Sequence, residues 1–272
     1  MFVTKADGRR EPFQREKIIR TCLRNHVSKE KAEEIAARIE SKVYDGIETR
    51  KIIKMILDLL KQYKPVYRYH IDLKEAIGLI KPKPDFEEFV RIVLGANGYR
   101  TEANRMIKGF CVEHEVDGIL HMDNEKILLE VKHHDNYHTY LGLETCLEYY
   151  AAFLDMNEGG ANFDNLIIAC NTKFSDHAKK YAECKGMLLL GWRYPKNKGL
   201  EDLIEQFNLY PVTYLSGLSK RDYEKLSNSG IITLKQFVET DLKELRRITR
   251  LKIRTLENLK VKSEKILGLH SQ

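Results

Sequence analysis

Two carboxylates and a lysine lie close together on an expected β-hairpin. Asp117 precedes and Glu130 follows a turn expected at residues 123–124, and Lys132 comes two residues after Glu130. With a two-residue turn there, facing residues have numbers that sum to 247, which places Asp117 opposite Glu130 and Glu115 opposite Lys132. Because facing side chains on paired strands have Cβ atoms about 4.5–5.5 Å apart, the two carboxylates are expected to share one site.

These residue types suit the hydrolysis of a phosphodiester. Two carboxylates within an apolar strand pair repel each other unless a proton or a cation lies between them, and oxygen ligands favour a hard divalent ion such as Mg²⁺. Such an ion lowers the pKa of a bound water, while Lys132 can position that water or stabilise the charged transition state. The alternative is an acidic and basic ladder on a solvated sheet face, because short motifs of this kind recur by chance.

Histidines and glutamates beside the hairpin are weaker candidates. His133, His134 and His138 have a spacing that could indicate a transition-metal site. A strand end that runs into a loop seldom brings three imidazoles together without further ligands, so contact with nucleic acid is the preferred role. Glu144 and Glu148 lie one helical turn apart and are expected to be solvated.

The chain divides into three segments that must position these residues. Residues 1–80 combine a short strand and a turn with helical periodicity, and the sequence Lys-Pro-Lys-Pro at 81–84 indicates a linker, because its prolines exclude a regular helix. Residues 85–205 have a mixed α/β pattern, and residues 210–270 are helical in short pieces with glycines between them. The expected fold is an α/β domain with a mainly helical domain before it and an all-α domain after it.

The central segment is expected to form a mixed sheet with helices on both faces. Its elements follow the order helix, two strands, helix, strand, helix, strand. The helices are expected at residues 86–96, 140–156 and 176–185. The strands are expected at residues 115–122, 126–132, 166–170 and 187–190.

The composition predicts a cytoplasmic protein whose positive charge is concentrated at one end. The 272 residues include five scattered cysteines, which fit reduced thiols, and they contain neither a membrane-spanning apolar run nor an apolar signal core at the N-terminus. Residues 211–272 contain 13 Lys and Arg against 7 Asp and Glu, so this segment carries the whole net charge of +6. A basic element of this kind can neutralise the phosphates of a nucleic acid.

The central segment resembles the Mrr-type restriction endonucleases over residues 85–205. Asp117 together with Glu130-Val131-Lys132 is similar to the PD-(D/E)XK nuclease motif, and Phe-Glu-Glu-Phe-Val at 86–90 is similar to the first helix of that family. The resemblance implies a restriction-endonuclease-like mixed sheet and a Mg²⁺ or Mn²⁺ ion held by Asp117 and Glu130. It also implies a catalytic Lys132 and a helix-borne acid at Glu87. The sequence departs from many Mrr-type members in carrying Glu130 where they have Gln, which restores the general form of the motif.

The N-terminal segment resembles an ATP-cone, the nucleotide-sensing domain of ribonucleotide reductases, over residues 1–80. The resemblance rests on Val-Thr-Lys-Ala-Asp-Gly-Arg-Arg-Glu-Pro-Phe from position 3 and on Ile-Glu-Thr from position 47. It implies that ATP or dATP binds without being hydrolysed, with Lys5 and Lys17 on the phosphates and Glu11 and Thr49 on the base or ribose. Ala6 departs from the basic residue that is common in the family. The alternative is a helical domain with ordinary surface lysines.

The C-terminal segment resembles helix-hairpin-helix units. The similarity lies in Leu-Ser-Gly-Leu-Ser at 215–219 and Leu-Ser-Asn-Ser-Gly-Ile at 226–231, with a basic cluster further on. That cluster consists of Arg246, Arg247, Arg250, Lys252 and Arg254. In such units, backbone N–H groups at the hairpin bind DNA phosphates. The alternative is a protein-docking module.

The combined hypothesis is a metal-dependent DNA endonuclease that ATP or dATP regulates through the N-terminal domain. DNA and a nucleotide are the expected partners, a membrane is not, and a homodimer is expected. A catalytically inactive, nucleotide-responsive DNA-binding regulator is the first alternative, but it gives no reason for three intact hairpin residues. A protein-interaction scaffold is the second, and it does not explain the segregated charge.

Overall fold

A computed structural model of the chain describes residues 1–5, 8–24, 27–63 and 65–269. The chain forms two compact units, Met1–His70 and Ile71–Gln272, and each is described by itself. Within the described residues, none of the helices has both the length and the apolar character required to cross a membrane.

The first unit packs helices against a small three-stranded sheet. The strands lie in the order β2-β1-β3, with β1 and β2 antiparallel and β1 and β3 parallel. The elements are β1 Phe2–Thr4, β2 Arg10–Pro12, α1 Arg15–Arg24, α2 Lys29–Glu40, β3 Ile47–Glu48, α3 Thr49–Tyr63 and η1 Pro65–Arg68. The buried side chains of α2 recur every three or four residues, as an amphipathic helix requires: Ala32, Ile35, Ala36 and Ile39.

The second unit contains a five-stranded mixed sheet in the order β10-β8-β6-β5-β4. Strand β5 is antiparallel to both β4 and β6, whereas β8 is parallel to both β6 and β10. The strands are β4 Arg100–Lys108, β5 Glu113–Met122, β6 Glu125–Lys132, β8 Asn165–Cys170 and β10 Leu188–Leu190. A separate pair is formed by β7 Tyr140–Leu141 and β9 Lys173–Phe174.

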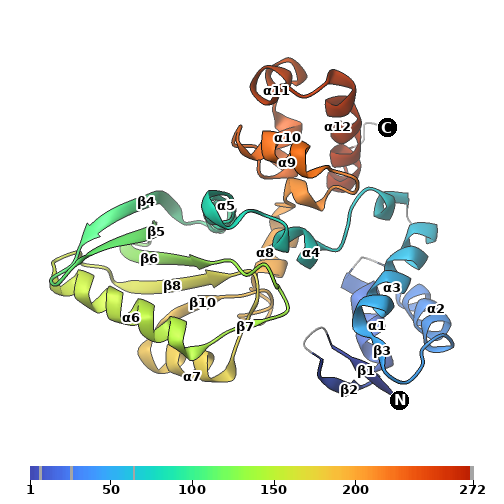
Figure 1. Cartoon of the computed structure of the whole chain (residues 1–272), viewed down its shortest axis with the longest axis horizontal. Coiled ribbons are helices and arrows are strands. Elements are labelled where there is room, and N and C mark those ends of the chain that lie inside the picture. Colours follow the sequence, from blue (N-terminus) through green and yellow to red (C-terminus); the bar gives the residue numbers. More distant parts are fainter. Residues whose placement is uncertain (6–7, 25–26, 64, 270–272) are drawn as a thin grey trace. The chain divides into compact units, whose positions relative to one another are not determined.

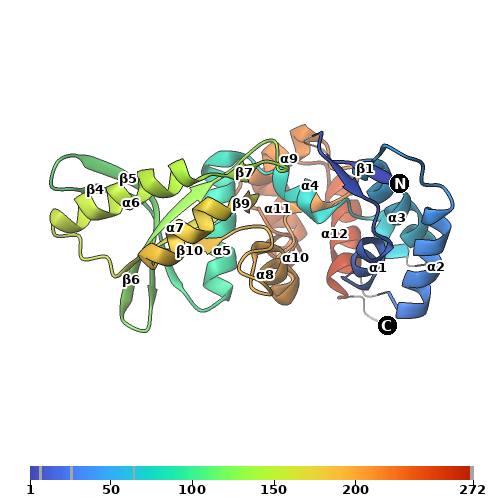
Figure 2. The same cartoon turned by 90° about the horizontal axis from the view of Figure 1, so that it is seen from below.

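Helices cover both faces of this sheet, as the sequence predicts. Helices α6 (Leu143–Glu158) and α7 (Asp176–Lys185) lie on one face, and α5 (Glu87–Ala96) lies on the other (Figures 1 and 2). Alternate residues of each strand join two different cores: Leu128 packs on the α6 side, and Leu129 packs on the α5 side with α8 (Leu200–Phe207). The predicted mixed sheet with helices on both faces is therefore confirmed.

Several elements differ from the expectation: β4, the short strands β7 and β9 and helix α8 were not expected, and α6 begins later. Strand β4 was not expected because its sequence, RTEANRMIK, lacks alternating apolar residues, and this is explained by its place at the sheet edge with mostly exposed side chains. Helix α6 begins at Leu143 instead of Tyr140, since Tyr140 and Leu141 pair with β9.

The Lys-Pro-Lys-Pro segment is not a free linker. It forms a helical turn, η2 (Pro82–Phe86), that is interrupted at Lys83, where φ is −126° and ψ is 138°. Asp85 is buried and accepts hydrogen bonds from the hydroxyls of Tyr223 (2.7 Å) and Ser227 (2.6 Å). This segment is therefore held against the C-terminal helices.

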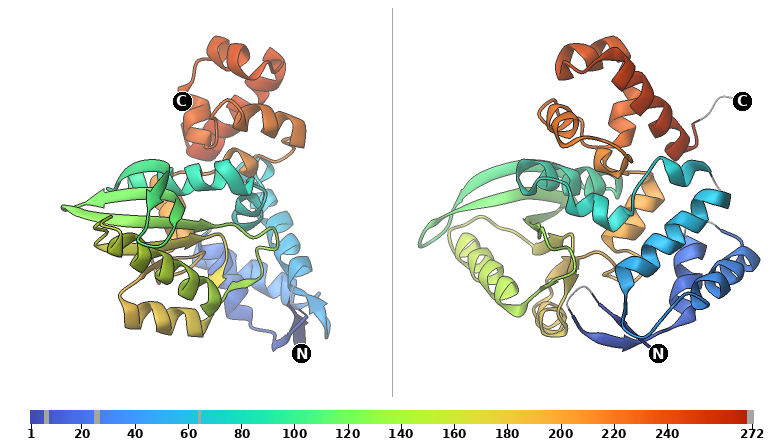
Figure 3. Two further views of the ribbon diagram at one scale, coloured as in Figure 1. Left: turned by 60° about the vertical axis from the view of Figure 1, so that its left-hand side comes forward. Right: turned by 45° about the vertical axis from the view of Figure 1, so that its right-hand side comes forward.

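The C-terminal helices form a group of their own, coloured orange to red in Figure 3. They are η3 Val212–Tyr214, α9 Lys220–Ser227, α10 Leu234–Glu239, α11 Leu242–Thr249 and α12 Ile253–Leu267, and α4 Leu73–Gly78 packs on η3. Gly217 (φ 76°) precedes α9, and Arg250 (φ 54°) precedes α12 in the same relative position. Gly230 (φ 75°), within the second expected unit at residues 226–231, lies in a left-handed turn as well, four residues before α10.

Candidate active site

The hairpin that carries the acidic residues has the predicted register over five residue pairs. The turn residues Asp123 and Asn124 both have positive φ (48° and 69°), as a two-residue hairpin turn requires. The ladder ends at Gly118↔Leu129, where β6 leaves β5 and continues along β8 alone. The side chains predicted to face each other therefore lie beyond the last pair, and that part of the prediction is wrong: Asp117 with Glu130, and Glu115 with Lys132.

Asp117 occupies the opening between the diverging strands. Its Oδ2 accepts a hydrogen bond from the backbone N–H of Val131 (2.8 Å), so the carboxylate takes the place of the missing ladder bond. Arg91 of α5 donates to the Asp117 carbonyl oxygen (2.6 Å) and pairs with Glu88 (2.8 Å). The side chain is 6% exposed. These contacts fix Asp117 and leave Oδ1 to face the other charged groups.

Glu87 reaches Asp117 from the first turn of α5. Its side chain is 1% exposed, and Asn104 of β4 donates to its Oε2 (3.1 Å). Burial raises the pKa of Glu87, and the negative charge of Asp117 acts in the same direction. Lys83 opposes both effects, because its Nζ lies 3.0 Å from Glu87 Oε1 and 3.1 Å from Asp117 Oδ1. Burial lowers the pKa of Lys83, but these two carboxylates outweigh it and raise the pKa above its usual range.

Glu130 lies on the α6 side of β6, together with Lys132. Burial, and then the charge of Asp117, raises the pKa of Glu130 to about 9, so the isolated carboxyl holds a proton at neutral pH. The ammonium of Lys132 acts in the opposite direction and lowers this pKa, followed by that of Lys83 and, with a smaller effect, Tyr149 of α6. The Lys132 Nζ lies 4.9 Å from the centroid of the Tyr149 ring. Glu87, Asp117 and Glu130 thus interact through their charges at the point where the strands separate.

The donor set fits a hard divalent ion in chemical type. Asp117 and Glu130 are buried carboxyls, and a cation between them would take the place of the proton that Glu130 otherwise holds. Among the described residues, no three His, Cys, Asp or Glu side chains already form a closed metal cage. Mg²⁺ does not require one, because it is usually held by one or two carboxylates, waters and the phosphates of a substrate.

Four residues of this site were not expected from the sequence: Lys83, Arg91, Asn104 and Tyr149. A signal existed for Lys83, which precedes Glu87 by four residues, but the Pro-rich context favoured a linker. Asn104 lies on the strand that was not expected. Tyr149 lies on an expected helix, but nothing local in the sequence directs it towards Glu130.

The three histidines do not form a metal site among the described residues. The side chain of His133 is 2% exposed and packs edge-on against Phe86, with ring centroids 5.0 Å apart, and burial lowers its pKa. His138 lies against Tyr137. His133 is therefore a core residue and not a surface contact for nucleic acid. Glu144 and Glu148 are exposed, as expected.

In the first unit, three of the four residues expected to bind nucleotide lie together. Glu11 Oε2 pairs with Lys17 Nζ at 3.0 Å and with Lys5 Nζ at 3.2 Å, and the pKa of Glu11 is lowered by Lys17 and then Lys5. Thr49 is half-buried at the first position of α3, directly after β3, which pairs with β1. Ala6 lies outside the described residues.

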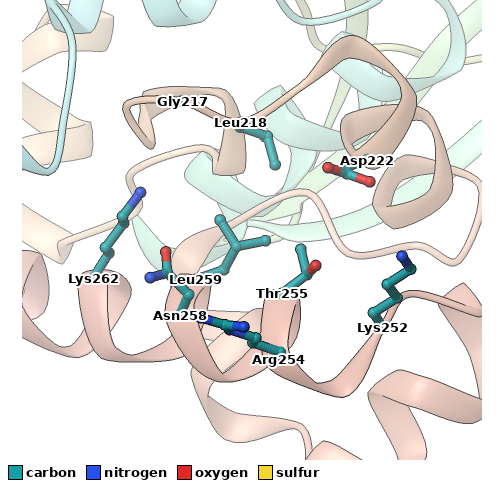
Figure 4. Close-up of a pocket in the computed structure, with 9 residues that line it drawn as sticks. All are labelled: Gly217, Leu218, Asp222, Lys252, Arg254, Thr255, Asn258, Leu259 and Lys262. Carbon is teal, nitrogen blue, oxygen red and sulfur yellow. The ribbon is translucent and has the colours of Figure 1, made fainter.

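The basic cluster of the C-terminal segment surrounds two hollows. One, of about 330 Å³, lies between the turn at Gly217 and the first turns of α12 (Figure 4). Its charged and polar lining residues are Asp222, Lys252, Arg254, Thr255, Asn258 and Lys262. The other, of about 560 Å³, is lined by Arg246, Arg250 and Lys252 with two apolar residues. Because both share Lys252, the basic surface is continuous.

Comparisons with known proteins match three parts of the chain. An ATP cone domain matches residues 1–74, a restriction endonuclease domain matches 82–191, and an AF1548-like C-terminal domain matches 210–267. An uncharacterised protein of Archaeoglobus fulgidus is 36% identical over 176 residues, which is 65% of this chain and 98% of that protein. A second uncharacterised protein of that organism is 53% identical over 38 residues, or 14% of this chain and 81% of its own length.

A solved structure agrees with these matches. The crystal structure of AF1548, a protein of unknown function, aligns with a TM-score of 0.59 and 32% sequence identity, covering 73% of this chain and 100% of that one. The fold and the site therefore define a restriction-endonuclease-like domain combined with an ATP-cone domain, which confirms both resemblances. More narrowly, the chain belongs to the family of AF1548-like proteins.

Proposed function

We propose that the chain is a divalent-metal-dependent DNA endonuclease whose ATP-cone domain regulates cleavage by binding ATP or dATP. The observation that carries the proposal is the convergence of Glu87, Asp117 and Glu130 where β5 and β6 separate, with Lys132 on the same strand as Glu130. Buried carboxylates of this kind need a cation, and a nearby ammonium suits a phosphate.

Each residue has a defined part in this mechanism. Asp117, oriented by the N–H of Val131, and Glu130, whose pKa Tyr149 lowers, would hold the metal. When bound, Mg²⁺ or Mn²⁺ supplies a water of lowered pKa and neutralises charge on the phosphate. Lys132 stabilises the negative charge that develops on the phosphate oxygens. Glu87, positioned by Asn104, adds negative charge beside Asp117.

The test is cleavage of plasmid, linear and branched DNA by the full chain with Mg²⁺, Mn²⁺ or EDTA. We expect cleavage only with the metals, and we expect Asp117→Ala, Glu130→Ala and Lys132→Ala each to abolish it. Cleavage that persists in Asp117→Ala at the wild-type rate, from protein free of contaminating nuclease, contradicts the proposal.

The C-terminal segment is proposed to bind DNA phosphates. Its support is the continuous surface around Lys252 and the net charge of +6 in residues 211–272. The left-handed turns at Gly217 and Arg250 expose backbone at the start of α9 and α12, where helix N-termini favour anions. These contacts would hold DNA without reading its sequence.

The first unit is proposed to bind the nucleotide through Lys5, Glu11, Lys17 and Thr49. Triphosphate oxygens would replace Glu11 as the partner of the two lysines, since phosphate carries more charge than one carboxylate. Calorimetry on the full chain should detect ATP or dATP binding that the pair Lys5→Ala and Lys17→Ala removes, and a non-hydrolysable analogue should alter cleavage as ATP does. The absence of binding at millimolar nucleotide contradicts this part of the proposal.

A homodimer is proposed for double-strand cleavage, because one site cuts one strand. A nucleotide that favours one oligomer over another would then control cutting. Light scattering with and without ATP measures the oligomeric state directly. The homodimer is contradicted if the protein is a monomer under both conditions and still cuts both strands in one binding event.

A further inference from the structure

Lys83 places a positive charge among the carboxylates of the candidate active site. Its ammonium lies 3.0 Å from Glu87 Oε1, 3.1 Å from Asp117 Oδ1 and 3.7 Å from Glu115 Oε1. It comes from η2, a segment that lies outside both strands of the motif. A charge in this position must affect any other cation that uses the same oxygens.

The Asp117 oxygen that Lys83 contacts is the one a metal would need. Oδ2 of Asp117 is taken by the N–H of Val131, so Oδ1 is the oxygen that is left for a metal. Two cations on one oxygen at bonding distance repel each other strongly at the low effective dielectric of a buried site. The Lys83 ammonium and a divalent ion on Asp117 Oδ1 therefore compete for this oxygen.

The surroundings of Lys83 allow its ammonium to move while its backbone stays in place. The Lys83 side chain is 59% exposed, so the ammonium can turn into solvent without opening the core. The backbone on its C-terminal side is fixed by buried Phe86 and by Asp85, which Tyr223 and Ser227 hold. A lysine stem is long and flexible enough for such an exchange.

We propose that Lys83 is a tethered counter-cation of the metal site, which a divalent ion must displace from Asp117 and which therefore sets the metal concentration at which the site fills. This inference rests on the proposed metal-dependent function. When Lys83 holds Glu87 and Asp117, their repulsion is compensated and the fold is stable without metal. Once displaced, the ammonium is free beside the site.

The proposal predicts opposite effects of one substitution on metal binding and on stability. Lys83→Met keeps the length of the stem and removes the charge. The metal then binds without a competitor, so its dissociation constant should fall by about tenfold or more. Without metal, Glu87 and Asp117 repel each other uncompensated, so the melting temperature in EDTA should fall.

The experiment is a titration of the full chain with Mn²⁺, followed by electron paramagnetic resonance of the free ion, with thermal unfolding in EDTA and in Mn²⁺. Lys179→Met is the matched control, because Lys179 also pairs with a carboxylate (3.1 Å to Asp176) but on the surface of α7. We expect tighter Mn²⁺ binding only in Lys83→Met. Lys83→Arg, which keeps the charge, should bind Mn²⁺ as the wild type does.

The outcomes separate this inference from the proposed function. Equal Mn²⁺ affinity in the wild type and Lys83→Met overturns the counter-cation role but leaves the metal site intact. Weaker binding in Lys83→Met overturns it as well, since Lys83 would then support the metal. If Mn²⁺ binds neither the wild type nor Lys83→Met, the metal site itself is overturned. If Lys83→Met unfolds in EDTA, the Mn²⁺ affinity of Lys83→Arg is the deciding measurement. If Lys83→Arg binds Mn²⁺ more tightly than the wild type does, the charge of Lys83 is not what weakens metal binding, and the counter-cation role is overturned.

Discussion

The candidate active site and the C-terminal basic surface use charge in opposite ways. At the active site, Asp117 and Glu130 are each 4% exposed, and fixed partners such as the N–H of Val131 determine their orientation. On the C-terminal surface, Arg246, Arg250 and Lys252 are exposed and line open hollows. Buried charge has a large energetic cost unless it is compensated, whereas exposed charge is screened by water and salt.

This difference separates two tasks. A buried cluster that needs compensation can select a small cation and hold it in one geometry, which chemistry requires. An exposed surface attracts any polyanion and loses affinity as salt rises, which suits the holding of DNA. Changes in the first region should therefore affect rate and metal dependence, and changes in the second should affect affinity and its salt dependence.

The largest expected effect is on the rate. Lys132→Met should lower DNA cleavage by roughly 10²–10³-fold or more, because a charge aimed at the developing phosphate charge is lost. DNA affinity should stay within about twofold of the wild type, since the proposed DNA-binding surface lies in the C-terminal segment. Single-turnover cleavage and fluorescence anisotropy measure the two quantities. If Lys132→Met lost DNA affinity in proportion to its loss of cleavage rate, Lys132 would belong to the DNA-binding surface as well as to the active site.

The next effect is on affinity. Replacing Arg246, Arg250 and Arg254 by Gln should weaken DNA binding strongly and make the slope of log affinity against log salt shallower by about 2–3, as expected when three phosphate contacts are lost. Cleavage at saturating DNA should remain near the wild-type rate. An unchanged salt slope would place the DNA surface elsewhere. Lys179→Gln, on α7, is the control for removal of surface charge.

A smaller effect is expected on stability as pH changes. The pKa of Glu130 is raised to about 9, against about 4.3 for an unfolded Glu. The native state therefore binds this proton more tightly than the unfolded state does. The proton's contribution to the free energy of unfolding is fully present below about pH 4.3 and is lost as the pH rises towards 9. Glu130→Gln keeps the neutral form, so its melting temperature relative to the wild type should rise across this range in EDTA. A constant difference would contradict the buried, protonated state.

The smallest expected effect concerns Tyr149. Tyr149→Phe keeps the ring beside Lys132 but removes the hydroxyl that lowers the pKa of Glu130. Metal binding should weaken severalfold, because the net contribution of one ordinary hydrogen bond is about 0.5–1.5 kcal/mol. Mn²⁺ titration measures it. Unchanged metal affinity would show that Tyr149 only packs against Glu130.

The sequence predicts those features of the site that depend on neighbours along the chain. The turn at Asp123 and Asn124 and the alternation of β5 and β6 specify the hairpin, and its register follows from the turn length. The end of the β5–β6 ladder is not a local feature: β6 pairs with β8 from Ile127 to Lys132, but its pairing with β5 stops at Leu129. The position of Asp117 in that opening could not be deduced from the hairpin alone.

The residues that were missed are those brought in by tertiary contacts. Strand β4, which carries Asn104, is polar because it lies at the sheet edge, so it lacks the apolar period that marks a strand. Lys83 was assigned to a linker because its prolines hide a helical turn that packs through Asp85 on the C-terminal helices. The C-terminal basic surface, in contrast, was predicted from composition alone, because the excess of Lys and Arg in residues 211–272 can be counted without knowing which residues are in contact.

The most direct test of the central claim is a comparison of Asp117→Asn with the wild type at saturating plasmid DNA, in Mg²⁺ and in EDTA. Asn keeps the size of the side chain and removes the charge that a metal requires. The account predicts that the wild type cuts only in Mg²⁺, and that Asp117→Asn does not cut under either condition although it binds DNA with wild-type affinity and salt slope. Cleavage by Asp117→Asn at the wild-type rate, or equal cleavage by the wild type in EDTA, would contradict it.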